Sequence, residues 1–399
     1  MYQTIKQFRN QILGLLWSIQ TANTSASVFP TRSESFAEWQ SETSHGKSLW
    51  FRPGVEETIP ALPYAGNWEA VQQALDSFPS HLRSVYLDDI DREWQIRSPD
   101  ERVFELENGR ALTNLGIVLT PDNVQINDLS GGSIYGLTKH KTNFQVRTLP
   151  PLKKLRGRVL LLASGLGQRN FYHWTAEMMP RIRLVRDAGI DFDHILIPKR
   201  HHYHRESLLL LGISPDKIVG IGKYAHIQAE ALIATSKIRQ ELSSTNVRFL
   251  HDSMAGQAWS KTSDPNRMRI YIARRTNGWR SVVNERELIN AITPLGFRPV
   301  FLEDLTYKQQ IQLFQQSEFV IGPHGSGLVN LAYCNSGTRV IEIGTPVRPN
   351  VLFHIIAYHR GLIYRNFFGT AVKARNDESH IDVDVADLLS TLHELQEST

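Results

Sequence analysis

The chain has 399 residues, a length that fits two domains, and its hydrophobic content of 41% and charged content of 21% are those of a globular protein. The formal net charge of +4 suits an anionic ligand or an anionic membrane surface, and the lack of a long Lys/Arg run with interleaved aromatic residues disfavours nucleic acid as a partner. The single cysteine, Cys334, excludes an internal disulfide and a metal site built from several cysteines, and we expect it to be a buried spectator.

The first hundred residues are dense in Ser, Thr, Pro and Gly, which predicts a peripheral, irregular extension over residues 1–100. Lys6 and Arg9 precede a short apolar run from Ile12 to Ile19, a pattern that resembles a weak signal peptide. An amphipathic helix, docked on the protein or lying on a membrane, fits this run at least as well. Because no run of about 18 apolar residues occurs, no transmembrane helix is expected. We therefore expect a cytoplasmic protein, with residues 1–20 as a candidate for peripheral contact with the inner face of a membrane.

A hairpin pattern precedes an alternation of strands and helices that begins at about residue 157. The stretch RVFELENGRALTNLG predicts a β-hairpin with Asn108–Gly109 as its turn. The alternation that follows favours parallel βαβ units. It places strands at 158–164, 194–198, 217–221 and 230–236, and helices at 170–189 and 205–212.

A polar break at residues 260–268 is followed by a second alternating region. Its strands are predicted at 269–274, 298–302, 318–322 and 339–344, and its helices at 284–296, with Asn284 as N-cap, 307–317, 349–361 and 383–396. We therefore expect two doubly wound α/β domains, at 101–262 and 263–399. Ligands bind such sheets outside the carboxyl ends of the strands, at topological switch points, and a cleft between two domains is a natural ligand site.

The stretch GPHGSGLVN reads as a glycine loop between a buried strand and a helix. Gly322, Gly325 and Gly327 permit tight turns, and the helix start offers N–H groups to a phosphate. His324 would add a donor, and Asn330 lies one turn into the helix. The loop lacks the Lys-Ser/Thr pair of a P-loop, and its glycine order is not that of a dinucleotide fingerprint. The alternative is a tight turn with a surface histidine.

Charged residues follow the neighbouring strands. Arg274, Arg275 and Arg280 lie where a parallel sheet presents its ligand edge, and guanidinium groups suit phosphate contacts. A solvated surface position fits Arg275 better than Arg274, because strand alternation gives the two residues opposite faces. Glu342 ends an apolar strand and is a candidate for accepting ribose hydroxyls, or else a buried acid paired with a nearby arginine.

The stretch NFYHWTAEMMPR is rich in aromatic residues and carries a His/Glu pair. His173 and Glu177 are four residues apart and share one helix face, and Asn170 is a candidate N-cap. Aromatic faces and such a pair suit a sugar and a general base. The alternative is a core-facing aromatic turn in which His173 is bonded to Glu177. HxxxE alone is not a zinc site.

Three weaker signals are most simply explained as surface loops or solvated patches. Asp89-x-Asp91 resembles a divalent-metal pair but is most simply a surface loop. The histidines of KRHHYHR at 199–205 indicate a mobile charged loop, and KKLRGR at 153–158 a solvated or acceptor-facing patch. We expect no metal site.

Taken in order, three motifs resemble the DUF563 glycosyltransferases, carbohydrate-active family 61. The family's N-Y-Y-H-W…E…P-R element is matched by Asn170–Trp174 with Glu177, Pro180 and Arg181. Its Y-I-S-R…R…NE element is matched at 271–285, and its glycine-loop element at 320–343, with Ser326 where alanine is usual. The resemblance covers roughly residues 155–365 and leaves out the first hundred.

The resemblance implies a GT-B-like α/β fold of two facing Rossmann-like domains, with the nucleotide sugar in the C-terminal one. It also implies inversion at the sugar carbon, no obligatory metal and no cofactor. Family members include plant xylosyl- and arabinosyltransferases, animal O-linked N-acetylglucosaminyltransferases and many bacterial proteins linked to capsule or exopolysaccharide. Without a clear membrane anchor the chain looks closer to the bacterial set, with a glycan or glycolipid acceptor.

In such a transferase the leaving nucleoside diphosphate, expected to be UDP, needs fixed cations and N–H dipoles when no metal is present. The nucleotide-sugar contacts would come from Arg274, Arg280, His324, Gly325, Ser326, Gly327, Asn330 and Glu342. Either Glu177 or His173 would be the base for the acceptor hydroxyl, with Asn170, Tyr172 and Trp174 positioning the acceptor. A non-catalytic nucleotide- or sugar-binding protein on the same fold is the alternative, and a dehydrogenase is disfavoured by the missing GxGxxG.

Overall fold

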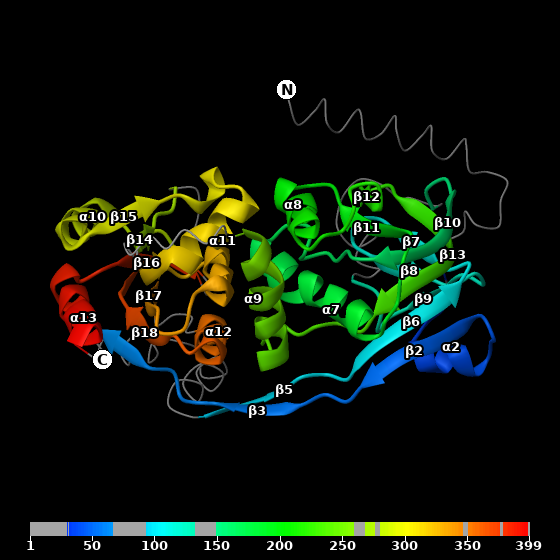
Figure 1. The fold of residues 1–399 in the computed structure, drawn as a ribbon, viewed down its shortest axis with the longest axis horizontal. Helices are drawn as coiled ribbons and strands as arrows, with labels where there is room; N and C mark the ends of the chain where they lie inside the picture. Colours follow the sequence, from blue (N-terminus) through cyan, green and yellow to red (C-terminus); the bar gives the residue numbers. More distant parts are fainter. Residues whose placement is uncertain are drawn as a thin grey trace, which may run out of the picture. The chain divides into compact units, whose positions relative to one another are not determined.

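The computed structural model describes residue 30 and residues 32–66, 93–131, 149–258, 268–275, 280–345, 350–375 and 378–397. The apolar run near the N-terminus and Asp89-x-Asp91 lie outside these residues. The chain divides into two compact units (Figure 1): unit 1 comprises Met1–Gly54 and Pro99–Arg239, and unit 2 comprises Val55–Ser98 and Gln240–Thr399. Each contains a sheet with parallel strands, so the predicted α/β class is confirmed.

Unit 1 is built around one mixed sheet. Its strands are β1 (Arg32–Glu34), β2 (Gly46–Arg52), β6 (Glu101–Glu107), β7 (Arg110–Leu112), β8 (Ile117–Leu119), β9 (Val124–Ile126), β10 (Lys153–Leu161), β11 (His194–Pro198), β12 (Ile218–Ile221) and β13 (His226–Thr235). Its helices are α2 (Phe36–Ser41), α6 (Phe171–His173), the π-helical η2 (Trp174–Met178), α7 (Met179–Asp187) and α8 (His202–Leu210).

The parallel part of this sheet has the strand order β13-β10-β11-β12. Val159, Leu160 and Leu161 of β10 are all buried, as expected for a parallel strand covered on both faces. Helix α7 packs against β6 and β13, and α8 against β11. The predicted strands and helices of this region are confirmed, except that α8 begins at His202, inside the segment predicted to be a mobile loop.

The predicted hairpin at Asn108–Gly109 is wrong. Strands β6 and β7 both pair antiparallel with β13, so the chain continues along the same neighbour instead of turning back. Asn108 has φ 52 and donates its N–H to the Glu230 carbonyl, which makes the dipeptide a bulge. The hairpin lies one element later, between β7 and β8. An Asn-Gly pair fits a bulge as well as a turn, because both use positive φ.

Unit 2 contains a parallel sheet, a small β-ladder beside it and a second small ladder near the C-terminus. Its strands are β3 (Glu56–Ile59), β4 (Tyr64–Gly66), β5 (Trp94–Arg97), β14 (Met268–Ile272), β15 (Phe297–Val300), β16 (Ser317–Pro323), β17 (Arg339–Gly344), β18 (Ile363–Phe368), β19 (Thr370–Arg375) and β20 (Glu378–Asp382). Its helices are α9 (Ser244–Ala258), α10 (Glu285–Ile292), η3 (Thr293–Leu295), η4 (Leu302–Asp304), α11 (Tyr307–Gln316), η5 (Ser326–Tyr333), α12 (Leu352–Arg360) and α13 (Val385–Glu397).

The parallel sheet of unit 2 has the order β15-β14-β16-β17-β18-β4 and separates two helix layers. Helices α10 and α13 bury their apolar residues against one face, and α11 and α12 lie on the other (Figure 1). Asn284 occupies the predicted N-cap position of α10, but its side chain bonds to the backbone of Val383 instead of capping the helix. Cys334 is buried, as predicted.

The bounds of the units differ from the expected domain limits at two places. Helix α9 belongs to unit 2, where it packs against η5, α11 and α12, so the units divide between Arg239 and Gln240. The first hundred residues contribute strands to both units, because β2 pairs with β6 in unit 1 and β4 with β18 in unit 2. Pairing between segments so far apart in the chain leaves no local sequence pattern.

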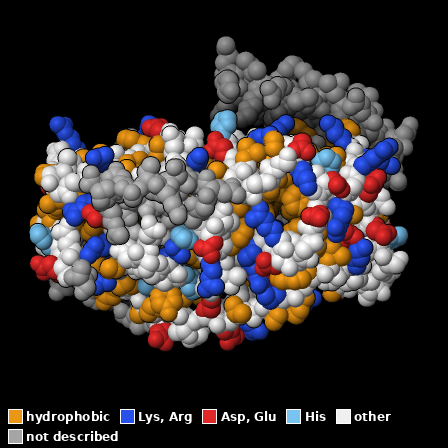
Figure 2. Space-filling model, in the orientation of Figure 1, with side chains coloured by type: hydrophobic (Ala, Val, Ile, Leu, Met, Phe, Trp, Pro, Cys, Tyr) orange, Lys and Arg blue, Asp and Glu red, His pale blue; other side chains and the backbone are white. Residues whose placement is uncertain are grey.

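The surface carries mixed charge. Figure 2 shows Lys and Arg side chains interspersed with Asp and Glu on the face drawn. Among the described helices, none combines the length and apolar composition that crossing a bilayer requires.

Candidate functional site

Unit 1 has a pocket at the switch point of its parallel strands. Strands β11 and β12 follow β10 on one side, whereas β13 lies on its other side, so the carboxyl ends of β10 and β13 meet at the switch. Ser164 and Leu166 follow β10, and Lys237 and Ile238 follow β13. These residues line a pocket of about 330 Å³, which we call the unit 1 pocket. Its other lining residues are Gln125, Asn127, Ser130, Gly131, Glu177 and Arg181.

The helix after β10 brings Glu177 and Arg181 to this pocket. Asn170 caps it as predicted, accepting the N–H of Tyr172 at 2.8 Å. From Trp174 to Met178 the helix widens into a π turn, in which the Met179 N–H bonds to the Trp174 carbonyl. Pro180 follows directly, and its ring and missing N–H disfavour a regular α-turn before it. Such π turns are frequent at functional sites.

His173 and Glu177 form a close pair within this turn. Nδ1 of His173 lies 2.5 Å from Oε1 of Glu177, with the two side chains only 17% and 16% exposed. An ionised carboxylate accepts the Nδ1 proton, which leaves Nε2 as the nitrogen that can gain or lose a proton. The pair could therefore accept a proton through either residue, and of the two only Glu177 is among the residues that line the unit 1 pocket.

Arg181 is a buried cation with an incomplete set of partners. It is 5% exposed, and its Nε has no hydrogen-bond partner among the described residues. Burial lowers the pKa of Arg181 to about 10, against the opposing effect of Glu177. Lys237 donates to the Asn127 carbonyl at 3.0 Å, and desolvation and then Arg181 lower the pKa of its ammonium.

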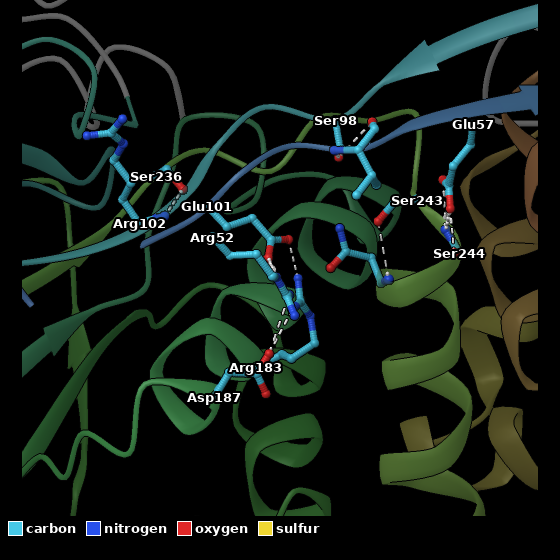
Figure 3. A network of polar contacts seen from close by, with 12 residues as sticks. Arg52, Glu57, Ser98, Glu101, Arg102, Arg183, Asp187, Ser236, Ser243 and Ser244 are labelled. Atoms are coloured by element: carbon cyan, nitrogen blue, oxygen red, sulfur yellow. Dashed lines mark hydrogen bonds and ion pairs between the residues drawn. The ribbon is translucent and has the colours of Figure 1, made fainter. Parts of the chain in front are cut away.

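An ion-pair network anchors helix α7 to the sheet of unit 1. Figure 3 shows Glu101 of β6 between Arg52 of β2 and Arg183 of α7. Nε of Arg52 donates to Glu101 at 2.7 Å, and Arg183 also donates to Asp187 at 2.9 Å. The buried carboxylate therefore has partners on both oxygens, and α7 is tied to two strands through Arg183, two residues after Arg181.

The aromatic residues predicted to position an acceptor are largely core residues. Trp174 is fully buried, donates Nε1–H to Ser207 at 2.9 Å, and packs on His204 with ring centroids 4.5 Å apart. Tyr172 is 5% exposed. Their burial makes them structural neighbours of the His173–Glu177 pair. His204, predicted to lie on a mobile loop, is fully buried because it fills the space between this helix and α8.

Unit 2 also gathers polar groups at its switch point, which lies between β14 and β16. Arg274 follows β14 and His324 follows β16. Nη1 of Arg274 donates to the His324 carbonyl at 3.0 Å, so the two predicted residues are brought together. Arg275 points elsewhere, pairing with Asp304 at 2.6 Å and lying over the Phe301 ring, as expected for the surface position.

The glycine loop lies against Arg274. A Cβ at Gly325 would come within 3.3 Å of Nη1 of Arg274, so the absence of a side chain lets the guanidinium approach the loop. Gly327 lies against Leu302, where a Cβ would be 2.5 Å from Cδ1. The helix that Ser326 begins is a 3₁₀ helix, with the Leu328 N–H bonded to the Gly325 carbonyl.

Glu342 holds His324. Oε1 of Glu342 lies 2.5 Å from Nδ1 of His324, and Oε2 accepts the hydroxyl proton of Tyr364. Glu342 is fully buried, and burial, then the nearby carboxylate, raises the pKa of Tyr364. Both oxygens expected to accept ribose hydroxyls are thus already engaged within unit 2. The geometry matches the alternative of a buried acid with a partner, although the partner is a histidine.

Asn330 is too buried for the ligand contact predicted for it, whereas Arg280 is half-buried. Asn330 is fully buried and donates to Gln310 at 2.8 Å, and its Oδ1 has no partner among the described residues, so it faces the helix layer. Arg280 has φ 68 and donates its backbone N–H to the Ser379 carbonyl at 2.8 Å. Its Nε lacks a hydrogen-bond partner within the described part of the chain.

The sequence predicts no role for three residues of these sites: Arg181, which occurs only as part of a motif, Lys237 and Tyr364. Lys237 had a usable signal, because it directly follows the strand predicted at 230–236, which is β13 in the structure. Tyr364 had none, since its hydroxyl reaches Glu342 from the neighbouring strand β18. No cluster of three or more His, Cys, Asp or Glu side chains suited to a metal occurs within the described ranges.

Comparison with known proteins finds a family model that matches the central segment. Residues 171–341 match the model of the family described as Glycosyltransferase 61. The relatives include the EGF domain-specific O-linked N-acetylglucosamine transferase of Gallus gallus, 29% identical over 82 residues, or 19% of this chain and 15% of that protein. The Drosophila melanogaster protein of the same name is 29% identical over 113 residues, or 28% of this chain and 21% of that protein.

The matched stretches thus span about a fifth or less of the length of these relatives. Together the family match and the relatives support the resemblance to glycosyltransferase family 61 and, at the level of enzyme class, a glycosyltransferase.

Proposed function

We propose that the chain transfers a sugar from a nucleotide sugar, expected to be UDP-linked, to a hydroxyl of a polysaccharide or glycoconjugate, with inversion and without a metal. The observation that carries the proposal is the placement of polar groups at both switch points. The family match includes Glu177 and Arg181 in unit 1 and Arg274 and His324 in unit 2. We propose further that the two units are the Rossmann-like domains of a GT-B-like transferase.

In the proposed mechanism unit 2 binds the nucleotide sugar. The departing diphosphate gains negative charge as its bond to the sugar breaks, and fixed cations stabilise that charge. Arg274 supplies a guanidinium beside the glycine loop, and Arg280 supplies a second. With Nδ1 of His324 held by Glu342, its Nε2 is the ring nitrogen proposed to bond the phosphate. Glu342 is then a positioning residue for His324 and not a ribose ligand.

Unit 1 is proposed to activate the acceptor. The attacking hydroxyl must lose its proton as the new glycosidic bond forms, which requires a base at the reacting oxygen. Glu177 faces the unit 1 pocket and is our candidate for that base, with His173 holding its other oxygen in place. The proton then passes to Glu177, and the diphosphate leaves as the free nucleotide.

A non-catalytic sugar- or nucleotide-binding protein remains the second candidate. The observation in its favour is the buried Arg181, a cation that lines the same pocket as Glu177 and can bind an anionic ligand without any proton transfer. The two candidates differ in one result: an enzyme releases UDP from a UDP-sugar, whether to an acceptor or to water, and a binding protein releases none.

The resemblance also supports a setting for the reaction. We propose a bacterial enzyme of the capsular or exopolysaccharide type, acting in the cytoplasm, with residues 1–20 as a possible contact with the inner face of the membrane. Co-sedimentation of the full chain with anionic vesicles, compared with a chain lacking these residues, tests this contact. Equal sedimentation of the two chains would contradict it.

The donor site is tested by nucleotide binding. UDP should raise the thermal midpoint of the wild-type chain, because a ligand that binds only the folded state stabilises it, by about 2.7 kcal/mol at 100 times Kd. Arg274→Ala should weaken binding, whereas Arg275→Ala should not, since Arg275 pairs with Asp304. If millimolar UDP and other nucleoside diphosphates leave the wild-type midpoint unchanged, the transferase proposal loses its main support.

Metal independence is tested on the same preparation. Release of UDP from the donor should continue in the presence of EDTA, because the proposed charge stabilisation comes from side chains. Complete loss with EDTA and recovery with manganese would contradict this prediction and would direct attention to Asp89 and Asp91.

A further inference from the structure

The unit 1 pocket has more positive than negative charge. Arg181 and Lys237 are its basic lining residues, and Glu177 is its acidic one. Among these lining residues, with Glu177 ionised, one positive charge is left over; Asp128 does not line the pocket, but its charge opposes the lowering of the Lys237 pKa. The two cations are close enough for Arg181 to lower the pKa of Lys237, so they repel each other across the pocket.

Arg181 is also incompletely bonded. It is buried to 95%, yet its Nε has no hydrogen-bond partner in the described part of the chain. A buried donor without a partner is costly, by about 1–3 kcal/mol and more for a charged group. A planar guanidinium is suited to an acceptor with two oxygens, such as a carboxylate or a phosphate. Neutral hydroxyls would satisfy the N–H group but leave the charge uncompensated.

The pocket is small and built from rigid parts. Its volume of about 330 Å³ lies near the lower end of the usual range for ligand pockets, about 300–1,000 Å³, which suits one sugar residue better than a nucleotide sugar. Helix α7, which carries Arg181, is held by the Arg183–Glu101–Arg52 network. The Lys237 ammonium is held at the Asn127 carbonyl. These are the features of a preformed site.

We propose that the unit 1 pocket recognises an anionic group on the acceptor, a carboxylate or a phosphate, through Arg181 and Lys237. This inference rests on the proposed function, because it takes the pocket to be the acceptor site. The bound anion neutralises the excess charge, and its neighbouring hydroxyl is then held near Glu177. The acceptor class is therefore an acidic sugar or a sugar phosphate, and not a neutral sugar.

The proposed recognition of an anionic group is tested by the thermal stabilisation that small ligands give the full chain at constant ionic strength. The probes are glucuronate, glucose 6-phosphate, inorganic phosphate and glucose. Glucuronate, glucose 6-phosphate or both should raise the thermal midpoint in a saturable way, whereas glucose should not. A response to glucuronate alone identifies a carboxylate acceptor. A response to glucose 6-phosphate and inorganic phosphate identifies a phosphorylated one, and each of these results supports the proposal.

Two variants locate the effect. Lys237→Met should fold, because the residue is exposed overall. It should lower the affinity for the anion by about tenfold, the lower end for loss of a charge-assisted hydrogen bond. Lys154→Met is the matched control, an exposed lysine of the same unit that does not line the pocket, and it should leave the anion affinity unchanged. Arg181→Lys keeps the charge but loses the planar fork and should also weaken binding.

Stabilisation by glucose equal to that by the anions would overturn the inference, and so would an anion affinity that is unchanged in both Lys237→Met and Arg181→Lys. Absence of any stabilisation by glucuronate, glucose 6-phosphate and phosphate would also overturn it. UDP binding and UDP release from the donor are measured on the same preparations. If these persist while the anions fail, the anionic acceptor is wrong and the proposed transferase stands.

Discussion

Two histidines in this molecule share one arrangement, and their carboxylate partners differ in accessibility. His173 and His324 each lie 2.5 Å through Nδ1 from a glutamate oxygen. Glu177 is 16% exposed and lines a pocket, whereas the side chain of Glu342 is 1% exposed and its second oxygen holds Tyr364. The same pair of residue types therefore differs in access: Glu177 borders a pocket, whereas both oxygens of Glu342 are engaged within unit 2.

If Glu342 positions His324, a change at Glu342 should weaken UDP binding although Glu342 itself does not contact UDP. Glu342→Gln keeps the size of the side chain but removes the carboxylate charge that holds Nδ1 of His324. UDP affinity should fall by about tenfold, the lower end for loss of a charge-assisted hydrogen bond. Isothermal titration of UDP measures this. Tyr364→Phe is the control. It keeps the aromatic ring and leaves the contact between Glu342 and His324 in place, so it should have a smaller effect on UDP affinity. Unchanged UDP affinity in Glu342→Gln would remove His324 from the proposed phosphate site.

At the scale of elements, local sequence patterns predicted where strands end, and strand ends placed the main candidates. Arg274 and His324 were expected at a ligand edge, and the structure brings them together there. The local shape of the connecting segments was not predictable in the same way. The π turn before Pro180 and the 3₁₀ form of η5 depend on packing against neighbouring elements. The bulge at Asn108 depends on the partner strand β13.

The close approach of two loops at the unit 1 pocket predicts a glycine requirement. A Cβ at Gly131 would lie 2.6 Å from the Ala163 carbonyl oxygen and 2.7 Å from Cα of Ser164. Gly131→Ala must therefore displace backbone at the end of β10, at a cost of about 1–3 kcal/mol. Gly165→Ala is the matched control, because its nearest contacts would be 3.6 Å.

Chemical denaturation of both variants measures the difference. Gly131→Ala should lower the free energy of unfolding and weaken ligands of the unit 1 pocket, and Gly165→Ala should do neither to a comparable extent. Equal stability of the two variants would show that the loops at this edge of the sheet are not packed as described.

At the scale of the whole molecule, the sequence predicted an α/β protein but not which segments join which unit. Val55–Ser98 belongs to unit 2 because Tyr64 of β4 pairs with Asn366 of β18, far along the chain. Hydrophobic periodicity reports the face that a strand buries and not the strand beside it. Likewise, Asn330 and Glu342 carried the residue types of a ligand site, and only the fold shows that both are buried.

Acid sensitivity follows from two buried neutral histidines in unit 1. Burial lowers the pKa of His204 and of His226 to about 4, while each would have its ordinary value of 6.5 in the unfolded chain. Between these values the unfolded chain binds more protons, so stability falls as pH falls from 6.5 towards 4 and these groups add no further loss below it. The expected loss is roughly 2 kcal/mol per histidine by pH 5.

Unfolding at pH 7.5 and pH 5 measures this loss in the wild type and in His226→Gln. The variant should lose roughly 2 kcal/mol less than the wild type over this range, relative to its own stability at pH 7.5. The exposed His202 provides the control, and His202→Gln should follow the wild type. Parallel pH profiles for all three proteins would mean that His226 is not held neutral by burial.

The central claim is that unit 2 holds the leaving nucleotide and unit 1 holds the base. The most direct measurement compares UDP affinity and sugar transfer in Glu177→Gln and Arg274→Ala. Glu177→Gln should keep UDP affinity and lose transfer, since Gln has nearly the same shape and adequate helix propensity but cannot take a proton. Arg274→Ala should weaken UDP binding and slow sugar transfer by about 10²–10³-fold. Transfer by Glu177→Gln at close to the wild-type rate would pass the role of base to His173, and loss of UDP binding in Glu177→Gln would contradict the division of labour between the units.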